Sequence, residues 1–452
     1  MDSDRDVFSS VAPRDPETSP VGPAGSGRRL DRALFLLIFV VVFMSHFVSP
    51  AAQTSDAVWN MAVAYSLVTQ GNANLDEFEP MLASINYAAT EQVDGHYYNL
   101  FPIGPSLMAV PFMYVLLKSG AGLTFFNEHG LDNRGPQQNF DILVASILVA
   151  LASAILFLTV RTAAVPPGAA MLLVFIFAFC TPVWSTASRS LWTHGPSVLM
   201  LCLTAFLLLR GRAHPSSLGF TGLPLAIAFI CRPTNAIPIA LLGGWLLVRH
   251  RRQFFYFVAW AMPVALPWIA YNLSVYGTAL PGYHDPSRAS GWNSFLVALP
   301  ANMISPGRGL LVFCPIFLFS IYGVVLRWKE NRLRDEFGIF SGVIFLHWIV
   351  HSRFAHWWMG HSYGPRAFTD CVPFLTLLLV PVIPKLQSDR THAAGRFLLR
   401  GVFCAAVLFS FFVHFRGATT NAVHDWNIEP VNIDTAPERV WDWSDPPFLR
   451  GL

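Results

Sequence analysis

A stretch without a single Lys or Arg, residues 33–117, constrains the topology of this chain more than any other feature. It opens with an uncharged apolar run at 33–49, close to the roughly 17 to 25 residues that a membrane-spanning helix needs. Three arginines lie just before this run, within 28–32, and basic residues are retained on the cytoplasmic side. The sequence therefore predicts an inside N-terminus, one crossing, and a large outer loop at 50–101 with Asp56 just above the first helix.

Composition agrees with a membrane protein. The chain is 54% hydrophobic and 13% charged, whereas a soluble domain has about 25% charged residues. The predicted fold class is all-α, a polytopic integral membrane protein. The net charge of +3 is small and scattered, so no nucleic-acid partner is expected. The six cysteines lie in or beside apolar runs and form no CxxC pair, so they predict no disulfide framework.

Composition and charge also suggest three regions. Residues 1–32, rich in Pro, Ser, Gly and charge, are predicted to form a disordered cytoplasmic tail, which makes the first helix an uncleaved anchor. The transmembrane domain is predicted at 33–415, followed by an extracytoplasmic tail at 416–452. Basic clusters mark the segments expected inside, namely 249–252, 327–334 and 385–400.

The number of crossings follows from parity. Seven apolar runs precede the inside cluster at 249–252, but the count from an inside N-terminus must be even. The run at 220–248 is interrupted by Pro233, and neither half reaches about 20 residues, so we take it as one broken span. This predicts about eleven crossings, within a range of ten to thirteen. It would also place 185–194 inside.

The distinctive polar and aromatic residues gather in the outer loops. Residues 57–69 carry apolar side chains at three- to four-residue spacing, which predicts an amphipathic helix on the membrane surface. Carboxylate, Arg, His and aromatic side chains above an apolar bundle are suited to a sugar beside a lipid phosphate, since Arg pairs with phosphate in bidentate fashion. The tyrosines expected to contact sugar or acceptor are Tyr65, Tyr97, Tyr98, Tyr283 and Tyr363.

Several short motifs, in their order and spacing over about 33–385, resemble the polyprenyl-phosphate-sugar-dependent glycosyltransferases of the GT-C type. The similarity is to the protein mannosyltransferase and aminoarabinose transferase group, including bacterial members. The motifs are Asp56, Tyr65-Ser66-Leu67 with Gly71, 101–105, 184–189 followed by 192–196, Tyr271-Asn272, 305–309, and 362–366 with Asp370 and Pro373.

The resemblance implies a fold, a place and a chemistry. It implies a GT-C-like transmembrane domain in a bacterial inner membrane, with the active site on the outer side, where it also places 185–194. A polyprenyl phosphate is a good leaving group, so the enzyme must supply a base for the acceptor hydroxyl and positive charge near the phosphate. The resemblance assigns the base to Asp56 and the phosphate contacts to Arg189, His194, Arg308 and Arg366.

Nothing in the sequence requires a cofactor, and no residue is predicted to be a metal ligand. Whether the reaction depends on a divalent metal stays open, because Ala57 and His194 occupy positions at which relatives often have acidic residues. The predicted partners are the polyprenyl-phosphate sugar and a glycan, lipid or protein acceptor; the particular sugar and acceptor are not fixed.

Other interpretations stay open at this stage. Asp56 could cap a helix, Arg189 and Arg366 could anchor the fold or pair with Asp370, and the i, i+4 pair His347 and His351 could bind zinc. At the level of function, a lipid or sugar translocator of the flippase kind and an oligosaccharide ligase or polymerase are the alternatives.

Overall fold

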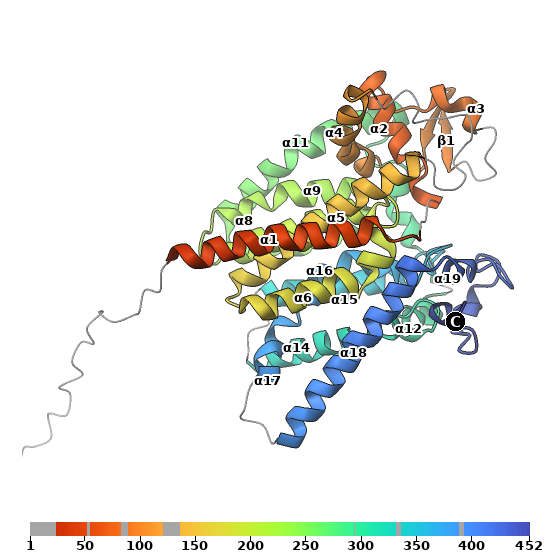
Figure 1. Cartoon of the computed structure of the whole chain (residues 1–452). Coiled ribbons are helices and arrows are strands. Elements are labelled where there is room, and N and C mark those ends of the chain that lie inside the picture. The colour runs from red at the N-terminus through yellow and green to blue at the C-terminus, as the bar shows by residue number, and fades with distance from the viewer. Residues whose placement is uncertain are drawn as a thin grey trace, which may run out of the picture.

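The computed structural model describes residues 24–51, 55–82, 89–120, 136–292, 294–330, 336–387 and 393–452. It is mostly helical, with the long helices gathered in one bundle and a small hairpin and the C-terminal tail toward the same end (Figure 1). The all-α prediction is confirmed. Residues 1–23 of the predicted tail 1–32 lie outside the described residues. The first helix begins at Ala24, inside the range predicted for the tail.

The first half of the chain contains α1 (Ala24–Phe47), α2 (Asn60–Thr69), α3 (Glu79–Leu82), β1 (Thr90–Val93), β2 (His96–Asn99), α4 (Gly104–Lys118), α5 (Pro136–Thr162), α6 (Pro167–Phe179) and α7 (His194–Arg210). Then follow α8 (Ser217–Phe220), α9 (Gly222–Cys231), α10 (Ala236–Arg249), α11 (Arg251–Tyr276), α12 (Phe295–Ile304), α13 (Leu310–Phe313), α14 (Leu318–Lys329), α15 (Glu336–His351), α16 (Val372–Leu377), α17 (Ile383–Gln387), α18 (Ala393–Thr419) and α19 (Ala422–Asp425).

Contacts between helix ends define two ends of the bundle. We call the end at which α1 finishes the site end. At the opposite end, Arg161 of α5 forms an ion pair with Asp31 of α1, with 2.9 Å between Nε and Oδ1. At the site end, the Asp141 carboxylate of α5 accepts a hydrogen bond from the backbone N–H of Leu191 at 2.8 Å. Helices α1 and α5, which pack along one another, are therefore antiparallel.

Helix α4 does not lead the chain to the opposite end. It packs on α2 and begins at Gly104. This glycine lies so close to Cys231, the last residue of α9, that a Cβ added to it would be only 2.7 Å away. Helix α5 starts again at the site end, where Gln137 donates to the Val58 carbonyl at 3.4 Å. The apolar run at 103–117 therefore does not connect the two ends of the bundle.

The prediction of one broken span at 220–248 is wrong. Helix α9 runs toward the site end and reaches Arg232, while Gly219 before it lies against Gln253 of α11. Helix α10 returns to Arg249, directly before α11. Pro233 and the short 3-10 turn Pro233–Asn235 join two helices rather than interrupting one. Helix α9 is mostly buried and α10 packs on α11 and α15, so contacts with neighbouring helices stabilise both despite their short length.

The segment 185–194 lies at the site end, contrary to the prediction from parity. The Arg189 side chain donates to the Ser49 carbonyl, just beyond the end of α1, at 2.8 Å. Parity failed because it counted 103–117 as a crossing and merged α9 with α10. The two errors place the segments between them at the wrong end of the bundle.

The first loop folds onto the bundle. The predicted helix at 57–69 exists as α2, but most of its residues are buried, so it packs between α4 and the hairpin rather than lying on a membrane surface. Strands β1 and β2 pair antiparallel with Val93 opposite His96, around a turn in which Asp94 and Gly95 both have positive φ. An Asp-Gly turn of this kind favours a two-residue hairpin.

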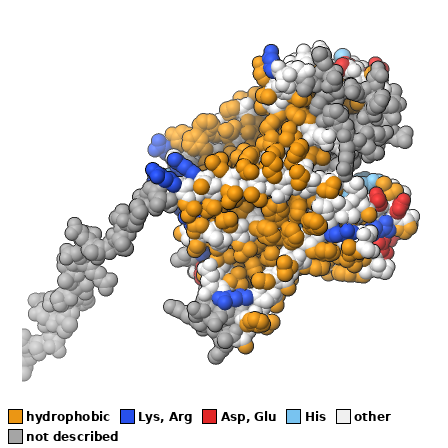
Figure 2. All heavy atoms as spheres, in the orientation of Figure 1, with side chains coloured by type: hydrophobic (Ala, Val, Ile, Leu, Met, Phe, Trp, Pro, Cys, Tyr) orange, Lys and Arg blue, Asp and Glu red, His pale blue; other side chains and the backbone are white. Residues whose placement is uncertain are grey.

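Among the described residues, five helical segments are long and apolar enough to cross a membrane, by length and composition: Gly27–Phe47, Gln137–Thr162, Arg251–Tyr276, Arg366–Gln387 and Phe397–Thr419. Hydrophobic side chains cover much of the visible face of the bundle, and charged side chains lie mainly toward its ends (Figure 2). Large apolar side chains are exposed along α1, α11 and α18. Such a surface is typical of helices that face lipid.

Candidate functional site

A cavity of about 690 Å³ opens at the site end. Segments that are far apart in the sequence line it together: the short turn Ser55–Ala57 beyond α1, the turn between α9 and α10, the loop after α11, the loop after α15, and the C-terminal tail. The lining residues are Asp56, Phe101, Arg232, Pro233, Thr234, Tyr283, Arg288, His351, Phe354, Ala355, His356, Met359, Gly360, His361, Arg366 and Asp434.

Asp56 and Arg366 meet in the wall of this cavity. Asp56 lies in the short 3-10 turn Ser55–Ala57 after α1, and its carboxylate forms an ion pair with Arg366, the first residue of the 3-10 helix Arg366–Cys371. The Arg366 guanidinium also lies over the ring of Trp192, 3.6 Å from the centroid. The absence of Lys and Arg from 33–117 leaves Asp56 without a basic partner nearby in the sequence, and its partner in the structure comes from a late segment that no local pattern connects to it.

His194 lies behind this pair and is fully buried. Its Nε2 is 3.2 Å from Nε of Arg366 and 3.0 Å from a terminal nitrogen of Arg232. Both arginines can only donate, so Nε2 must be the acceptor and the ring proton sits on Nδ1. Nδ1 is 3.3 Å from the Asp370 carboxylate. Because both ring nitrogens face protein groups, His194 is placed to orient two guanidiniums rather than to contact a phosphate directly.

Arg232, directly before the helix-breaking Pro233, is a site residue that was not among the residues predicted from the sequence. Its Nε is 2.6 Å from Oδ2 of Asp370, its guanidinium donates to Thr193 at 3.0 Å, and its side chain lines the cavity. Asp370 pairs with Arg232 and not with Arg366 as considered above. A lone Arg inside an otherwise apolar run was the available signal, since ionisable residues in such segments are often functional.

Arg189 does not line the cavity. It is completely buried, and its guanidinium donates to the backbone carbonyls of Ser49 at 2.8 Å, of Ala51 at 3.3 Å and of His46. These carbonyls lie at and just beyond the C-terminal end of α1, where a helix leaves acceptors without intrahelical partners. Arg189 therefore fixes the segment that leads to Asp56.

Arg308 is also buried and acts between loops. It donates to the carbonyls of Trp358 at 2.7 Å and Gly360 at 2.9 Å, and to the side-chain oxygen of Asn427 at 2.7 Å. It thus ties the loop after α15, which lines the cavity, to the C-terminal tail. Its donors face protein acceptors, so its position supports the cavity wall and does not add a free cation to it.

Of the five tyrosines predicted to contact sugar or acceptor, Tyr283 lines the cavity. Tyr363 is buried and donates to the Val413 carbonyl at 2.8 Å. Tyr65 packs edge-on against Phe78. Tyr97 and Tyr98 belong to strand β2, where Tyr98 lies 5.9 Å from the Tyr276 ring. The aromatic residues of the first loop therefore serve mostly to pack the loop.

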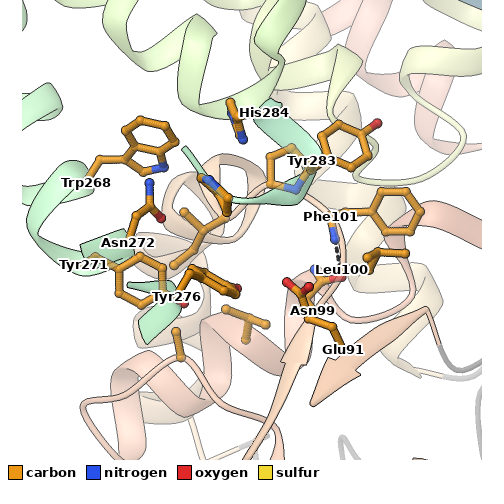
Figure 3. Close-up of a pocket in the computed structure, with 15 residues that line it drawn as sticks. Glu91, Asn99, Leu100, Phe101, Trp268, Tyr271, Asn272, Tyr276, Tyr283 and His284 are labelled. Carbon is orange, nitrogen blue, oxygen red and sulfur yellow. Dashed lines mark hydrogen bonds between the residues drawn. The ribbon is translucent and has the colours of Figure 1, made fainter. Parts of the chain in front are cut away.

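A narrow second cavity of about 30 Å³, enough for one or two waters, lies between the hairpin and the end of α11 (Figure 3). Phe101 and Tyr283 line both cavities, with their ring centroids 5.6 Å apart. Burial raises the pKa of Glu91, which accepts a hydrogen bond from Tyr276 that opposes the shift. Burial lowers the pKa of His284 to about 4, against a smaller opposing effect of its hydrogen bond to the Phe229 carbonyl.

No group of three His, Cys, Asp or Glu side chains suited to a metal ion occurs among the described residues. His347 and His351 do share a helix face, but each directs Nε2 to a backbone carbonyl, of Ala367 and Trp357 respectively, at 2.9 Å. Their spacing is therefore explained by packing around the loop after α15.

The cavity combines a carboxylate, two guanidiniums oriented by one histidine, and an aromatic face beneath one of them. Such an arrangement can bind a phosphate oxygen at Arg366 or Arg232 while Asp56 accepts a proton from a neighbouring hydroxyl. Comparison of the chain with protein-family profiles and with curated proteins finds no match.

Proposed function

We propose that the chain is a multi-pass membrane protein whose site end faces the non-cytoplasmic side. In this proposal eleven segments of the described part of the chain cross the membrane: α1, α5, α6, α7, α9, α10, α11, α14, α15, the α16–α17 segment and α18. The absence of Lys and Arg from 33–117, and the basic clusters near the opposite end, support this orientation. The cavity would then open to the extracytoplasmic space, beside the outer leaflet.

We propose further that the protein transfers a sugar from a polyprenyl-phosphate donor to an acceptor hydroxyl in this cavity. The observation that carries the proposal is the Asp56–Arg366 pair in the wall of a cavity of about 690 Å³. That volume lies within the range of about 300–1,000 Å³ common for small-molecule sites. The sequence resemblance to GT-C type glycosyltransferases points to the same chemistry.

The pairing suggests an order of events. Before the donor binds, the Arg366 guanidinium is paired with the Asp56 carboxylate. A donor phosphate competes for the guanidinium, since Arg binds phosphate oxygens in bidentate fashion, and this releases the carboxylate. The acceptor oxygen then bonds to the anomeric carbon as its proton passes to Asp56. The bond from that carbon to the phosphate oxygen breaks, and polyprenyl phosphate leaves against Arg366.

The groups behind Arg366 prepare it for this exchange. Trp192 beneath the guanidinium and His194 at its Nε hold the plane of the fork, while Arg232, fixed by Asp370, adds a second cation to the same wall. Charged groups that are already oriented stabilise a departing anion without reorganisation at the moment of reaction. Asp370, His194 and Trp192 are thus positioning residues in the proposal.

The test is an assay of purified protein with a panel of polyprenyl-phosphate monosaccharides, in which release of polyprenyl phosphate is measured. We expect release with at least one donor in the presence of a hydroxyl acceptor, and its loss in Asp56→Asn. A translocator would instead move a labelled lipid across a vesicle membrane without cleaving it. Movement without any cleavage across the panel contradicts the proposal.

A further inference from the structure

The C-terminal tail contributes a second carboxylate to the cavity. Asp434 lines the cavity wall, and its side chain is 46% exposed. The indole N–H of Trp358 donates to Oδ1 at 2.7 Å, which fixes the orientation of the carboxylate. Oδ2 lies 3.3 Å from Nε2 of His361, another lining residue.

Asp434 keeps hydrogen-bonding capacity toward the cavity. His361 is closer to the side-chain oxygen of Asn432, at 2.9 Å, than to Asp434, so its Nε2 proton is directed mainly to the amide. An ionised carboxylate offers about four acceptor positions. Within the described residues, the one salt-bridge partner of Asp434 is His361 and not an Arg or Lys. Besides its contact with His361, Oδ2 therefore has acceptor positions left for a ligand.

The tail is held firmly enough to present this carboxylate. Asp445 forms ion pairs with Arg439 at 3.0 Å and Arg450 at 2.7 Å, and buried Asn427 accepts from Arg308. The backbone N–H of Asp434 itself donates to the Asn432 side chain at 2.9 Å. A group fixed in this way loses little conformational freedom when a ligand binds.

We propose that Asp434, oriented by Trp358 and flanked by His361, forms a hydroxyl-recognition subsite for a neutral sugar ring. The charges of the cavity favour neutral hydroxyls over an amine as the donors to Oδ2. Arg366 is paired with Asp56 and Arg232 with the buried Asp370, which leaves Arg288 and Asp434, so these groups carry no net charge and suit a neutral ligand. This inference rests on the proposed function but concerns binding, which can be measured without turnover.

The test is equilibrium binding of methyl pentosides and methyl hexosides to the full chain in detergent, observed by saturation-transfer difference NMR. Asp434→Asn keeps the acceptor for Trp358 but replaces Oδ2 with a donor, so we expect binding to weaken about tenfold or more, as for loss of a charge-assisted hydrogen bond. Asp425→Asn, an exposed tail carboxylate that does not line the cavity, is the matched control and should bind like the wild type.

Trp358→Phe is a second variant, which keeps the carboxylate but removes its anchoring N–H, and it should also weaken binding. If Asp434→Asn proves unfolded, Trp358→Phe decides the matter alone. Wild-type affinity in either folded variant overturns the subsite, as does failure of every methyl glycoside to bind the wild type. Failure of the proposed function has a different signature: glycosides bind and depend on Asp434, yet no polyprenyl-phosphate donor is cleaved.

Discussion

Asp56 and Arg366 lie 310 positions apart in the sequence and form an ion pair in the wall of the cavity. The pair joins the segment after the first helix to the start of the segment that leads into α16. In the proposed reaction it keeps the base neutralised until a phosphate takes over the guanidinium. Each group would then be available for chemistry only when the donor is bound.

Arg366→Lys should weaken donor use by about 10- to 100-fold although the charge remains. Lysine cannot form the planar fork, lie flat on Trp192, or donate in the geometry of Nε to His194. The measurement is the donor concentration dependence of polyprenyl phosphate release, normalised to folded protein. Activity per folded molecule near that of the wild type would mean that Arg366 only anchors the fold.

Arg189→Gln should destabilise the protein rather than alter donor binding. The change leaves the carbonyls at the end of α1 short of donors, at about 1–3 kcal/mol for each buried acceptor. We expect a lower unfolding temperature in detergent, and a loss of activity that follows the loss of folded protein. Arg210→Gln, an exposed change at the far end of α7, is the control. A stable Arg189→Gln variant with impaired donor binding would restore the phosphate role.

His284 should make the protein less stable in acid. Its pKa is lowered by burial from 6.5 to about 4, so the folded state holds the neutral ring while the unfolded chain takes up a proton between these values. Stability is therefore complete above about pH 6.5 and falls as the pH is lowered toward 4, with about 2 kcal/mol lost at pH 5. His284→Gln should lose less stability than the wild type between pH 7.5 and pH 5 in thermal unfolding. Equal losses would refute this source of the acid sensitivity.

The orientation can be tested by cysteine labelling in a Cys404→Ser background, because Cys404 is the exposed native cysteine and the other five are buried. Gln92→Cys in the hairpin and Glu438→Cys in the tail, both at exposed positions, should react with an impermeant reagent in intact cells. His214→Cys, exposed between α7 and α8, should react only after permeabilisation. The reverse pattern would invert the topology.

The sequence predicted the helical class, the first helix and the grouping of polar residues near its end, because these depend on composition and local charge. The path between the ends could not be predicted reliably. Whether an apolar run such as 103–117 connects the two ends depends on what packs beside it, as α2 does against α4. Length alone also fails for α9 and α10, since helices that pack against neighbours can be short.

At the site, the sequence identified Asp56 and Arg366 as candidates, but it could not predict their pairing, which depends on the tertiary fold. It grouped Arg189 and Arg308 with Arg366 because all three are arginines near motifs. Only their surroundings separate them: backbone carbonyls surround Arg189, whereas a carboxylate and an indole face Arg366. Asp434 was missed because nothing in a charged, aromatic tail distinguishes one carboxylate from its neighbours.

The most direct test of the account is Asp56→Asn, with single-turnover sugar transfer and donor-lipid binding measured on the same preparation. Removing a general base costs about 10²- to 10⁴-fold in rate, so transfer should fall within that range while the fold persists. Donor binding should be retained or tightened, because Arg366 no longer has to break an ion pair with Asp56 before it binds the donor phosphate. Transfer at more than about a tenth of the wild-type rate, well short of that range, would contradict the assignment of Asp56 as the base.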